Sequence, residues 1–260
     1  MNFKSIGKAV STIVAAAFIF VATSLTTPVF ALDAAQKSEF EALIRSYLLK
    51  NPEIIVEMQD SLEKKRALEA SLKVQRTLTE KSDLVFNSKN QFEIGNPNAD
   101  VTVVEFFDYN CAFCKRAMSD MNRLLKEDAK LKFVLKELPI LSEGSVNAHK
   151  ISTAVGHLAP ERYEEFHNKL LGANGQKNGK RALKLADSMG LDIKKILAFS
   201  KKDSVVDGFR EVNSLANDLG MNGTPSYVIG DEVIFGALGY EVLKAKIDNL
   251  RKCGGNTTTC

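Results

Sequence analysis

The feature that most constrains this chain is a pair of cysteines, Cys111 and Cys114, placed between a strand-like and a helix-like segment. Residues 101–108 are β-branched and aromatic, which predicts a buried strand. Apolar residues then recur at helical spacing over residues 117–125. Cys111 is therefore expected at a helix N-terminus, where free N–H groups and the helix dipole stabilise a thiolate. Such a cysteine is a nucleophile, and a second cysteine three residues later can resolve the mixed disulfide.

Two other interpretations of the pair are less favoured by its context. A static disulfide would not need the strand–turn–helix setting. A structural zinc site usually needs four ligands, and the chain has no second Cys-x-x-Cys. Its three histidines, His149, His157 and His167, lie downstream in helix-like sequence and are each expected on a helix surface. We therefore predict a redox-active pair, with no metal and no other cofactor.

The rest of the chain predicts an α/β fold with a mixed sheet. Residues 131–138 alternate like a second strand, which gives a right-handed βαβ unit with the first. Residues from about 143 to 220 are mostly helical. Two short strands at residues 226–229 and 232–235 flank a Gly230-Asp231 turn, and a helix over residues 240–252 follows. This order predicts a thioredoxin-like fold with an inserted helical domain.

Two further positions are candidates for the site. Glu105 lies in the middle of the first strand, and the sequence leaves two alternatives open. It is either a buried acid with a raised pKa that exchanges protons with the thiols, or a side chain turned towards solvent. Thr224-Pro225 stands directly before the first strand of the hairpin, and its peptide bond can be cis or an ordinary trans bond.

Residues 1–31 have the layout of a cleaved secretory signal peptide. Lys4 and Lys8 precede an uncharged run from Ala9 to Leu25, and Val29 and Ala31 supply small residues at the −3 and −1 positions. An uncleaved membrane anchor is the alternative. Export to an oxidising compartment would allow a disulfide between Cys253 and Cys260, the remaining cysteines.

Residues 32–81 contain no obvious strand and predict two helices with a break at Asn51-Pro52. Their apolar positions form a stripe that needs a partner. The partner is either the chain's own core or a second copy, and the length and N-terminal position of the segment favour self-association. Dimer and trimer both fit.

The composition and charge of the chain limit the classes of binding partner that are expected. The chain has 260 residues, is 45% hydrophobic and 26% charged, and has 35 lysines and arginines against 32 acidic residues. These values are those of a globular protein. So small a positive excess predicts no nucleic-acid partner.

With these motifs placed, residues 82–252 resemble the DsbA-like thiol–disulfide oxidoreductases of the bacterial periplasm. The resemblance is carried by residues 104–115 (VEFFDYNCAFCK), 136–140 (KELPI) and 223–230 (GTPSYVIG). The segment before them, with residues 48–53 (LLKNPE), is similar to the oligomerising arm of Com1-type surface antigens and ScsC-type copper-tolerance proteins. The layout of residues 1–31 and the resemblance together predict three parts: a signal peptide (1–31), an oligomerisation arm (32–81) and a DsbA-like domain (82–260).

The resemblance also implies roles for single residues. Cys111 attacks, Cys114 resolves, Glu105 is the buried acid, and a cis Pro225 contacts the substrate backbone. Ala112, Phe113 and Thr224 complete the expected substrate-binding set. Many relatives have proline at the position of Ala112, and strongly oxidising members have histidine at that of Phe113.

These departures favour an isomerase or a dual oxidase and isomerase. The expected partners are cysteine-containing exported proteins and a membrane redox partner of the DsbB or DsbD type, and the expected location is the periplasm. Two other functions remain open: a copper-binding or copper-tolerance thiol protein, because soft thiolates suit Cu(I), and a surface antigen that uses the fold as a scaffold.

Overall fold

The fold is described from a computed structural model, which places residues 33–254. The predicted signal peptide and Cys260 lie outside the described residues. The chain divides into two compact units between Ser61 and Leu62, inside a long helix. Each unit is described by itself below.

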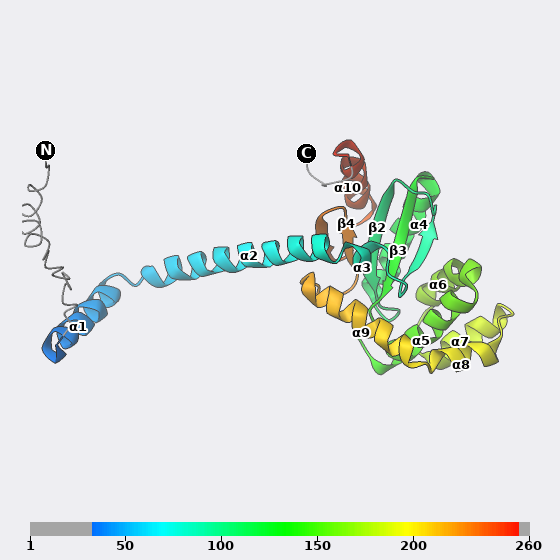
Figure 1. Cartoon of the computed structure of the whole chain (residues 1–260), viewed down its shortest axis with the longest axis horizontal. Coiled ribbons are helices and arrows are strands. Elements are labelled where there is room, and N and C mark those ends of the chain that lie inside the picture. Colours follow the sequence, from blue (N-terminus) through cyan, green and yellow to red (C-terminus); the bar gives the residue numbers. More distant parts are fainter. Residues whose placement is uncertain (1–32, 255–260) are drawn as a thin grey trace, which may run out of the picture. The chain divides into compact units, whose positions relative to one another are not determined.

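The order of the elements follows the expected order closely (Figure 1). The helices are α1 (Ala34–Lys50), α2 (Ile54–Glu80), α3 (Ser82–Phe86), α4 (Ala112–Glu127), α5 (Glu143–Leu158), the short 3-10 helix η1 (Pro160–Arg162), α6 (Tyr163–Gly172), α7 (Gly179–Ser188), α8 (Ile193–Ser200), α9 (Asp203–Asp218) and α10 (Tyr240–Lys252). The strands are β1 (Phe92–Gly95), β2 (Val101–Phe107), β3 (Leu131–Glu137), β4 (Ser226–Ile229) and β5 (Glu232–Phe235).

The five strands form one mixed sheet in the order β1-β3-β2-β4-β5. The β2 and β3 strands are parallel, with Val103 opposite Phe133, and all other pairs are antiparallel. The predicted α/β thioredoxin-like fold is therefore confirmed. The β1 strand was not predicted from the sequence, because four residues with only Phe92 and Ile94 buried give too short an alternation to recognise.

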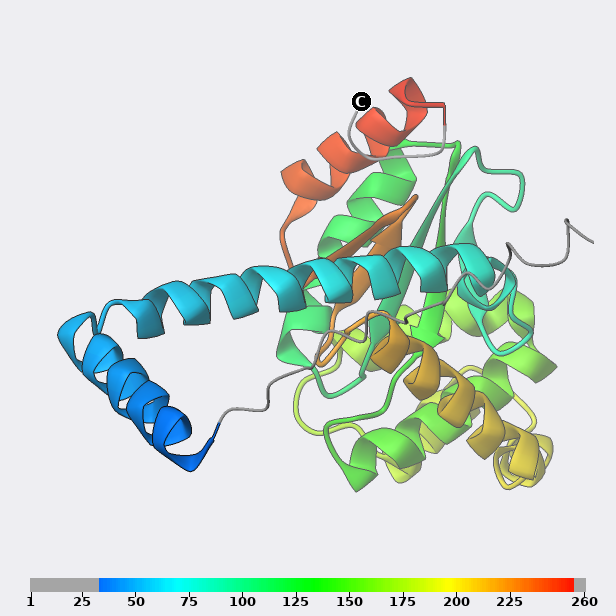
Figure 2. The same cartoon turned by 60° about the vertical axis from the view of Figure 1, so that its left-hand side comes forward.

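Each face of the sheet is covered by its own set of helices. Along β2, Val103 and Phe107 pack with α4, α5, α6 and α10, while Val104 and Phe106 pack with α2, α3 and α9. Because side chains alternate along a strand, Glu105 lies on the same face as Val103, towards α4. The C-terminal part of α2 crosses the other face (Figure 2), where Leu78 is buried in the core.

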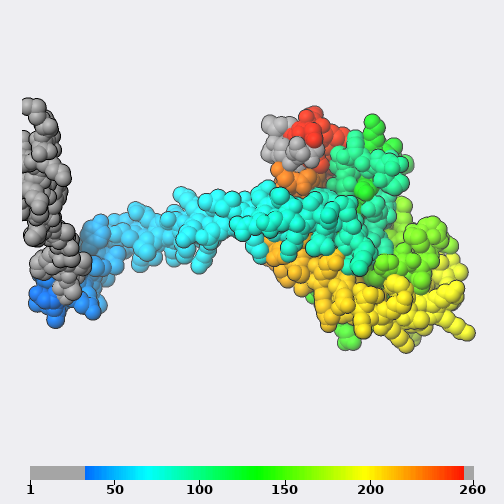
Figure 3. All heavy atoms as spheres, in the orientation of Figure 1, coloured from blue at the N-terminus to red at the C-terminus, as the bar shows by residue number. Residues whose placement is uncertain are grey.

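The inserted helical domain is formed by α5 to α9, between β3 and β4. Its central helix is α5, which packs against α6, α7, α8 and α9. The α9 helix returns to the sheet and lies beside the C-terminal part of α2 on the molecular surface (Figure 3). There Asp218 of α9 forms ion pairs with Lys73 and Lys81 of the α2 side, at 3.3 and 2.6 Å.

The N-terminal unit, residues 33–61, is described as α1 and the start of α2. Asp33 caps α1 with a reciprocal capping box, since its side chain accepts from Gln36 N at 2.8 Å and Gln36 Oε1 accepts from Asp33 N at 3.1 Å. The α1 helix buries no residue. Its large apolar side chains are 43–72% exposed and comprise Phe40, Leu43, Ile44, Tyr47, Leu48 and Leu49.

Candidate active site

The two cysteines lie at the start of α4, as the sequence predicts. Cys111 is the N-cap residue, and its sulfur accepts a hydrogen bond from Cys114 N at 3.4 Å. Both cysteines are free thiols. Cys114 is completely buried and Cys111 is 6% exposed, so Cys111 is the more accessible of the two.

A second segment, far away in the sequence, completes the surroundings of Cys111. The Cys111 sulfur lies 3.0 Å from the carbonyl oxygen of Thr224, which accepts the thiol proton while Cys111 is protonated. The peptide bond between Thr224 and Pro225 is cis, which agrees with the expectation from the family resemblance. Thr224 is half-buried and Pro225 is buried. The fold thus brings the loop before β4 against the N-terminus of α4.

The two thiols have opposite acidities. The Cys114 thiol donates to the Cys111 sulfur, and this hydrogen bond is the largest cause that lowers the pKa of Cys111 to about 5. The Thr224 side chain and the backbone N–H groups of Phe113 and Cys114 act in the same direction, against the effect of burial. Burial raises the pKa of Cys114 far above its usual range. At pH 7 Cys111 is therefore a thiolate by about one hundred to one, and Cys114 keeps its proton.

Glu105 is buried, and the sequence had left this undecided. It is 3% exposed, and it lies opposite Tyr227 in the pairing of β2 with β4. Burial is the main cause that raises the pKa of Glu105 to about 8, and the negative charge of Cys111 adds to it. A hydrogen bond from Tyr227 lowers the pKa in part. Glu105 is therefore largely protonated at neutral pH.

The turn that carries Cys111 is held by two polar side chains that the sequence analysis did not single out. Buried Asp108 accepts from the backbone N–H groups of Asn110, Ile140 and Leu141, at 2.8 to 3.0 Å. The side chain of Asn110 exchanges two hydrogen bonds with the backbone of Lys177, at 2.9 and 2.7 Å. A short polar residue directly after a buried strand is the signal that could have identified Asp108.

Two histidines are buried, so their predicted surface positions were wrong. His149 Nε2 accepts from Tyr109 N at 3.1 Å, and His149 Nδ1 lies 3.2 Å from Glu137 Oε2. Because Nε2 is an acceptor, the proton of the His149 imidazole is placed on Nδ1. Burial, with a smaller contribution from His149, lowers the pKa of His167 to about 3. His157 is exposed, as predicted. His149 lies on α5 and His167 on α6, and both helices pack against other helices of the insert, which a single sequence does not reveal.

Buried Glu137 is the centre of this polar network. It accepts hydrogen bonds from Thr153 at 2.8 Å and Tyr163 at 3.1 Å, and also from Ser152. Ser152 in turn lies 2.7 Å from the Tyr109 hydroxyl. The network connects α5 and α6 of the insert to the residues just before Cys111.

The predicted substrate-binding residues surround the thiols. Ala112 and Phe113 are exposed, Phe113 at 57%, and the Arg116 guanidinium stacks on the Phe113 ring at 4.6 Å. Their contact with substrate stays a prediction. Cys253 follows the end of α10, and its pairing with Cys260 also stays a prediction.

No group of three or more potential metal ligands occurs among residues 33–254. Within the same residues no helix is both long and apolar enough to span a bilayer.

Comparison with known proteins agrees with this geometry. The family described as DSBA-like thioredoxin domain matches residues 102–248. The chain belongs to this family. It is a family of thiol–disulfide oxidoreductases, so the chain is identified as a member of that enzyme class. A second family, the copper resistance protein ScsC N-terminal domain, matches residues 36–69.

Individual relatives fit the same assignment. A thioredoxin-like oxidoreductase from Silicibacter pomeroyi is 38% identical, with a TM-score of 0.62 over 65% of this chain and 97% of that one. ScsC from Proteus mirabilis, in a transitional conformation, is 28% identical, with a TM-score of 0.62 over 85% of this chain and 98% of that one. The disulfide bond formation protein D of Bacillus subtilis is 26% identical over 62% of this chain and 77% of its own length.

Proposed function

We propose that this DsbA-like protein exchanges disulfides with cysteines of exported proteins, with Cys111 as the attacking thiolate and Cys114 as the resolving thiol. The observation that carries the proposal is the difference between the two thiols. One is ionised at neutral pH and partly accessible beside the Thr224–Pro225 loop, whereas the other is protonated and buried. This difference decides which sulfur meets the substrate.

Isomerisation and oxidation of a substrate each proceed through two displacement steps at sulfur. In isomerisation, the Cys111 thiolate attacks a substrate disulfide, a mixed disulfide forms, and one substrate sulfur leaves as a thiolate. A substrate thiolate then attacks the mixed disulfide, and Cys111 is released. In oxidation, a substrate thiolate attacks the Cys111–Cys114 disulfide and a second substrate thiolate displaces Cys111. The substrate loses two electrons, and the enzyme pair gains them.

Glu105 is proposed to handle the proton of Cys114. The Cys114 thiol must lose its proton before its sulfur can attack a mixed disulfide. Glu105 lies on the α4-facing side of β2, and its charge and that of Cys114 influence each other. A carboxyl with a pKa of about 8 can both accept and return a proton near neutral pH.

A dual oxidase and isomerase accommodates the site best. The departures at Ala112 and Phe113 favour isomerisation, because the histidine that oxidising relatives have at the position of Phe113 is absent. The Cys114 thiol, backbone N–H groups and Thr224 nevertheless stabilise the Cys111 thiolate. A stabilised thiolate favours the reduced pair and makes the disulfide more oxidising. It is also the form that attacks scrambled disulfides.

Refolding of a disulfide-containing test protein separates the two activities. We expect activity on both scrambled ribonuclease and reduced ribonuclease, with the reduced and the oxidised enzyme respectively. Cys111→Ser should abolish both. Absence of both activities in the wild-type protein would refute the proposal.

We propose a periplasmic location and a membrane redox partner of the DsbB or DsbD type, which restores the pair after each turnover. The layout of residues 1–31 and the family support this location. Fractionation of cells that express the full chain tests it, with protein confined to the cytoplasm as the contrary outcome.

Self-association through the N-terminal arm is proposed from its exposed apolar side chains and its match to the ScsC N-terminal domain. The arm should be removed after Ser61, because Leu78 and Val74 of α2 belong to the core around the sheet. We expect light scattering to give an oligomer for the mature chain and a monomer for residues 62–260. Leu43→Glu in α1 should have the same effect, whereas exposed Lys37→Glu should not. An unchanged mass in the shortened chain would contradict the proposal.

A further inference from the structure

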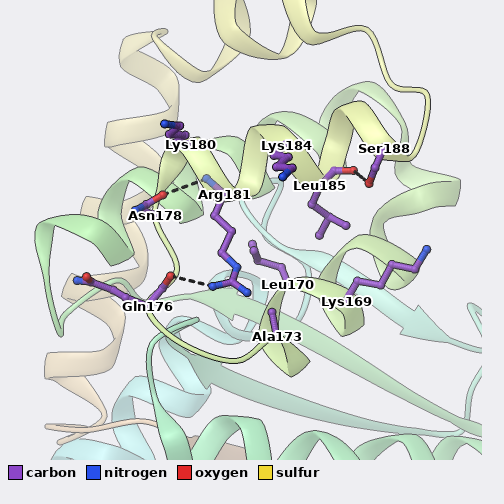
Figure 4. A pocket seen from close by; sticks show the side chains of 10 residues that line it. All are labelled: Lys169, Leu170, Ala173, Gln176, Asn178, Lys180, Arg181, Lys184, Leu185 and Ser188. Atoms are coloured by element: carbon purple, nitrogen blue, oxygen red, sulfur yellow. Dashed lines mark hydrogen bonds between the residues drawn. The ribbon is translucent and has the colours of Figure 1, made fainter.

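A cationic hollow lies next to the active-site turn, in the inserted domain. Its volume is about 640 Å³, and it lies between α6 and α7 (Figure 4). Leu170 and Leu185 supply apolar lining. Four cationic side chains line it, and no acidic residue does; they are Lys169, Lys180, Arg181 and Lys184.

The positive charges of the hollow are largely unneutralised. Lys169 pairs with Glu165 at 2.5 Å. Among residues 33–254, Lys180 and Lys184 make no ion pair, and the Arg181 guanidinium donates only to the Gln176 carbonyl, at 3.5 Å. Figure 4 shows the Arg181 side chain extended from α7 across the hollow towards Ala173. An anionic ligand would therefore meet cations that have few competing partners.

The hollow is joined to the residue before Cys111 by hydrogen bonds. Asn110 holds the backbone of Lys177 through two hydrogen bonds, and the neighbours of Lys177, Gln176 and Asn178, line the hollow. On the other side, Lys115 in the first turn of α4 donates to the carbonyl of Ala173, a lining residue, at 3.3 Å. The hollow is thereby connected to the active-site turn on two sides.

Lys177 gives an independent sign of uncompensated charge at this place. The residue is only 6% exposed, and its ammonium group, which is not among the buried polar atoms, forms no ion pair within the described part of the chain. Burial lowers its pKa, and the positive charges of Lys115 and Arg181 lower it further. Nearby Asp108 opposes this effect, but its carboxylate is already held by three backbone N–H groups. A ligand carboxylate would relieve the repulsion among these cations.

We propose that this hollow binds an acidic segment of the protein whose cysteine reacts at Cys111. The inference rests on the proposed function and specifies its substrate class. Carboxylates of the segment meet Arg181, Lys184 and Lys180, while its apolar side chains lie on Leu170 and Leu185. The hollow thereby favours substrates in which acidic and apolar residues flank the reacting cysteine.

Kinetics with matched peptides test the inference. Two disulfide-linked peptides differ only in having aspartates or asparagines beside the cysteine. We expect the reduced wild-type enzyme to attack the aspartate peptide roughly fivefold faster at low salt, as for a few exposed charge pairs, and the difference to shrink as salt is added. Arg181→Glu/Lys184→Glu should remove or reverse this preference and leave the rate with the asparagine peptide unchanged.

A control with the same change in total charge excludes general attraction by the whole molecule. Lys89→Glu/Lys194→Glu alters two exposed lysines that do not line the hollow, and it should keep the preference for the aspartate peptide. Equal rates for the two peptides in the wild type would overturn the inference. So would an equal loss of preference in the control.

A binding measurement separates failure of the hollow from failure of the proposed function. A fluorescent aspartate peptide that lacks cysteine should bind the wild type more tightly than the Arg181→Glu/Lys184→Glu variant, by anisotropy. If neither disulfide peptide reacts, the proposed function fails, and this measurement still decides whether the hollow binds acidic peptide. Equal affinity of both proteins would overturn the inference even where exchange is fast.

Discussion

The acidity of Cys111 should depend more on the Cys114 side chain than on any other single group. The hydrogen bond from the Cys114 thiol is the largest cause that lowers the pKa of Cys111 to about 5. Cys114→Ala removes that donor and leaves the helix N-terminus and Thr224 in place. Cys114→Ser removes the resolving thiol equally but keeps an O–H donor at the same position. The two variants therefore isolate one hydrogen bond.

The magnitude follows from the strength of such a bond. A hydrogen bond to a charged group contributes about 1.5–3 kcal/mol, which corresponds to roughly one to two pKa units. Cys114→Ala should raise the pKa of Cys111 to about 6–7, and Cys114→Ser should leave it near about 5. For a shift of about 1.5 units, the thiolate fraction at pH 5.5 falls roughly eightfold.

The assay is the rate of alkylation by iodoacetamide as a function of pH, read at the Cys111 peptide by mass spectrometry. Thiolate absorbance at 240 nm gives an independent titration. Both variants lack the second active-site thiol, so reaction at Cys114 cannot contribute. If the alanine variant titrates with the serine variant, the backbone N–H groups and the helix dipole set the acidity, and the assignment to the Cys114 side chain is refuted.

Three further substitutions test other parts of the site. Thr224→Val removes one stabiliser of the Cys111 thiolate, so for a change of about one pKa unit the reduction potential against glutathione should fall by roughly 30 mV; an unchanged potential would contradict this. Glu105 has a folded pKa of about 8, above its ordinary 4.5, so the native state binds the extra proton and its free energy of unfolding falls as pH rises from 4.5 to 8. Glu105→Gln should flatten this slope, by up to about 1.4 kcal/mol per pH unit in urea unfolding at pH 5 and pH 8, and an equally steep slope in the variant would disprove it. Glu137→Gln places an amide among buried donors, and we expect its free energy of unfolding to fall by about 2–4 kcal/mol, as measured by thermal unfolding. The exposed control Glu161→Gln should change the free energy of unfolding by less than about 0.5 kcal/mol. Equal losses in the two variants would exclude the network as the cause.

The local elements could be predicted from the sequence because their signals are local. The run before Cys111 and the apolar spacing after it defined β2 and α4 within a residue or two. The Gly230-Asp231 turn is confirmed as the connection of β4 to β5, and Gly230 adopts a φ of +61°, which glycine tolerates best. The hairpin and the helix after it began and ended where the sequence indicated.

Tertiary packing decided the chemical state of the site. Burial of Glu105 depends on which helix covers its face of the sheet, and the sequence of β2 alone leaves both faces possible. The burial of His149 on α5 and of His167 on α6 also depends on the neighbouring helices that pack against them. The contact between Cys111 and Thr224 joins residues 113 positions apart, so no local pattern contains it.

The sequence by itself determined the type of chemistry: two cysteines at the start of a helix, in a chain whose strands and helices have the thioredoxin order. Only the tertiary structure decided that buried Cys114 keeps its proton beside the thiolate expected at Cys111, and that a cationic hollow lies in the insert next to the active-site turn. The physical reason is that pKa values and surface charge depend on burial and on neighbours from distant segments. Strand and helix patterns depend on residues a few positions apart.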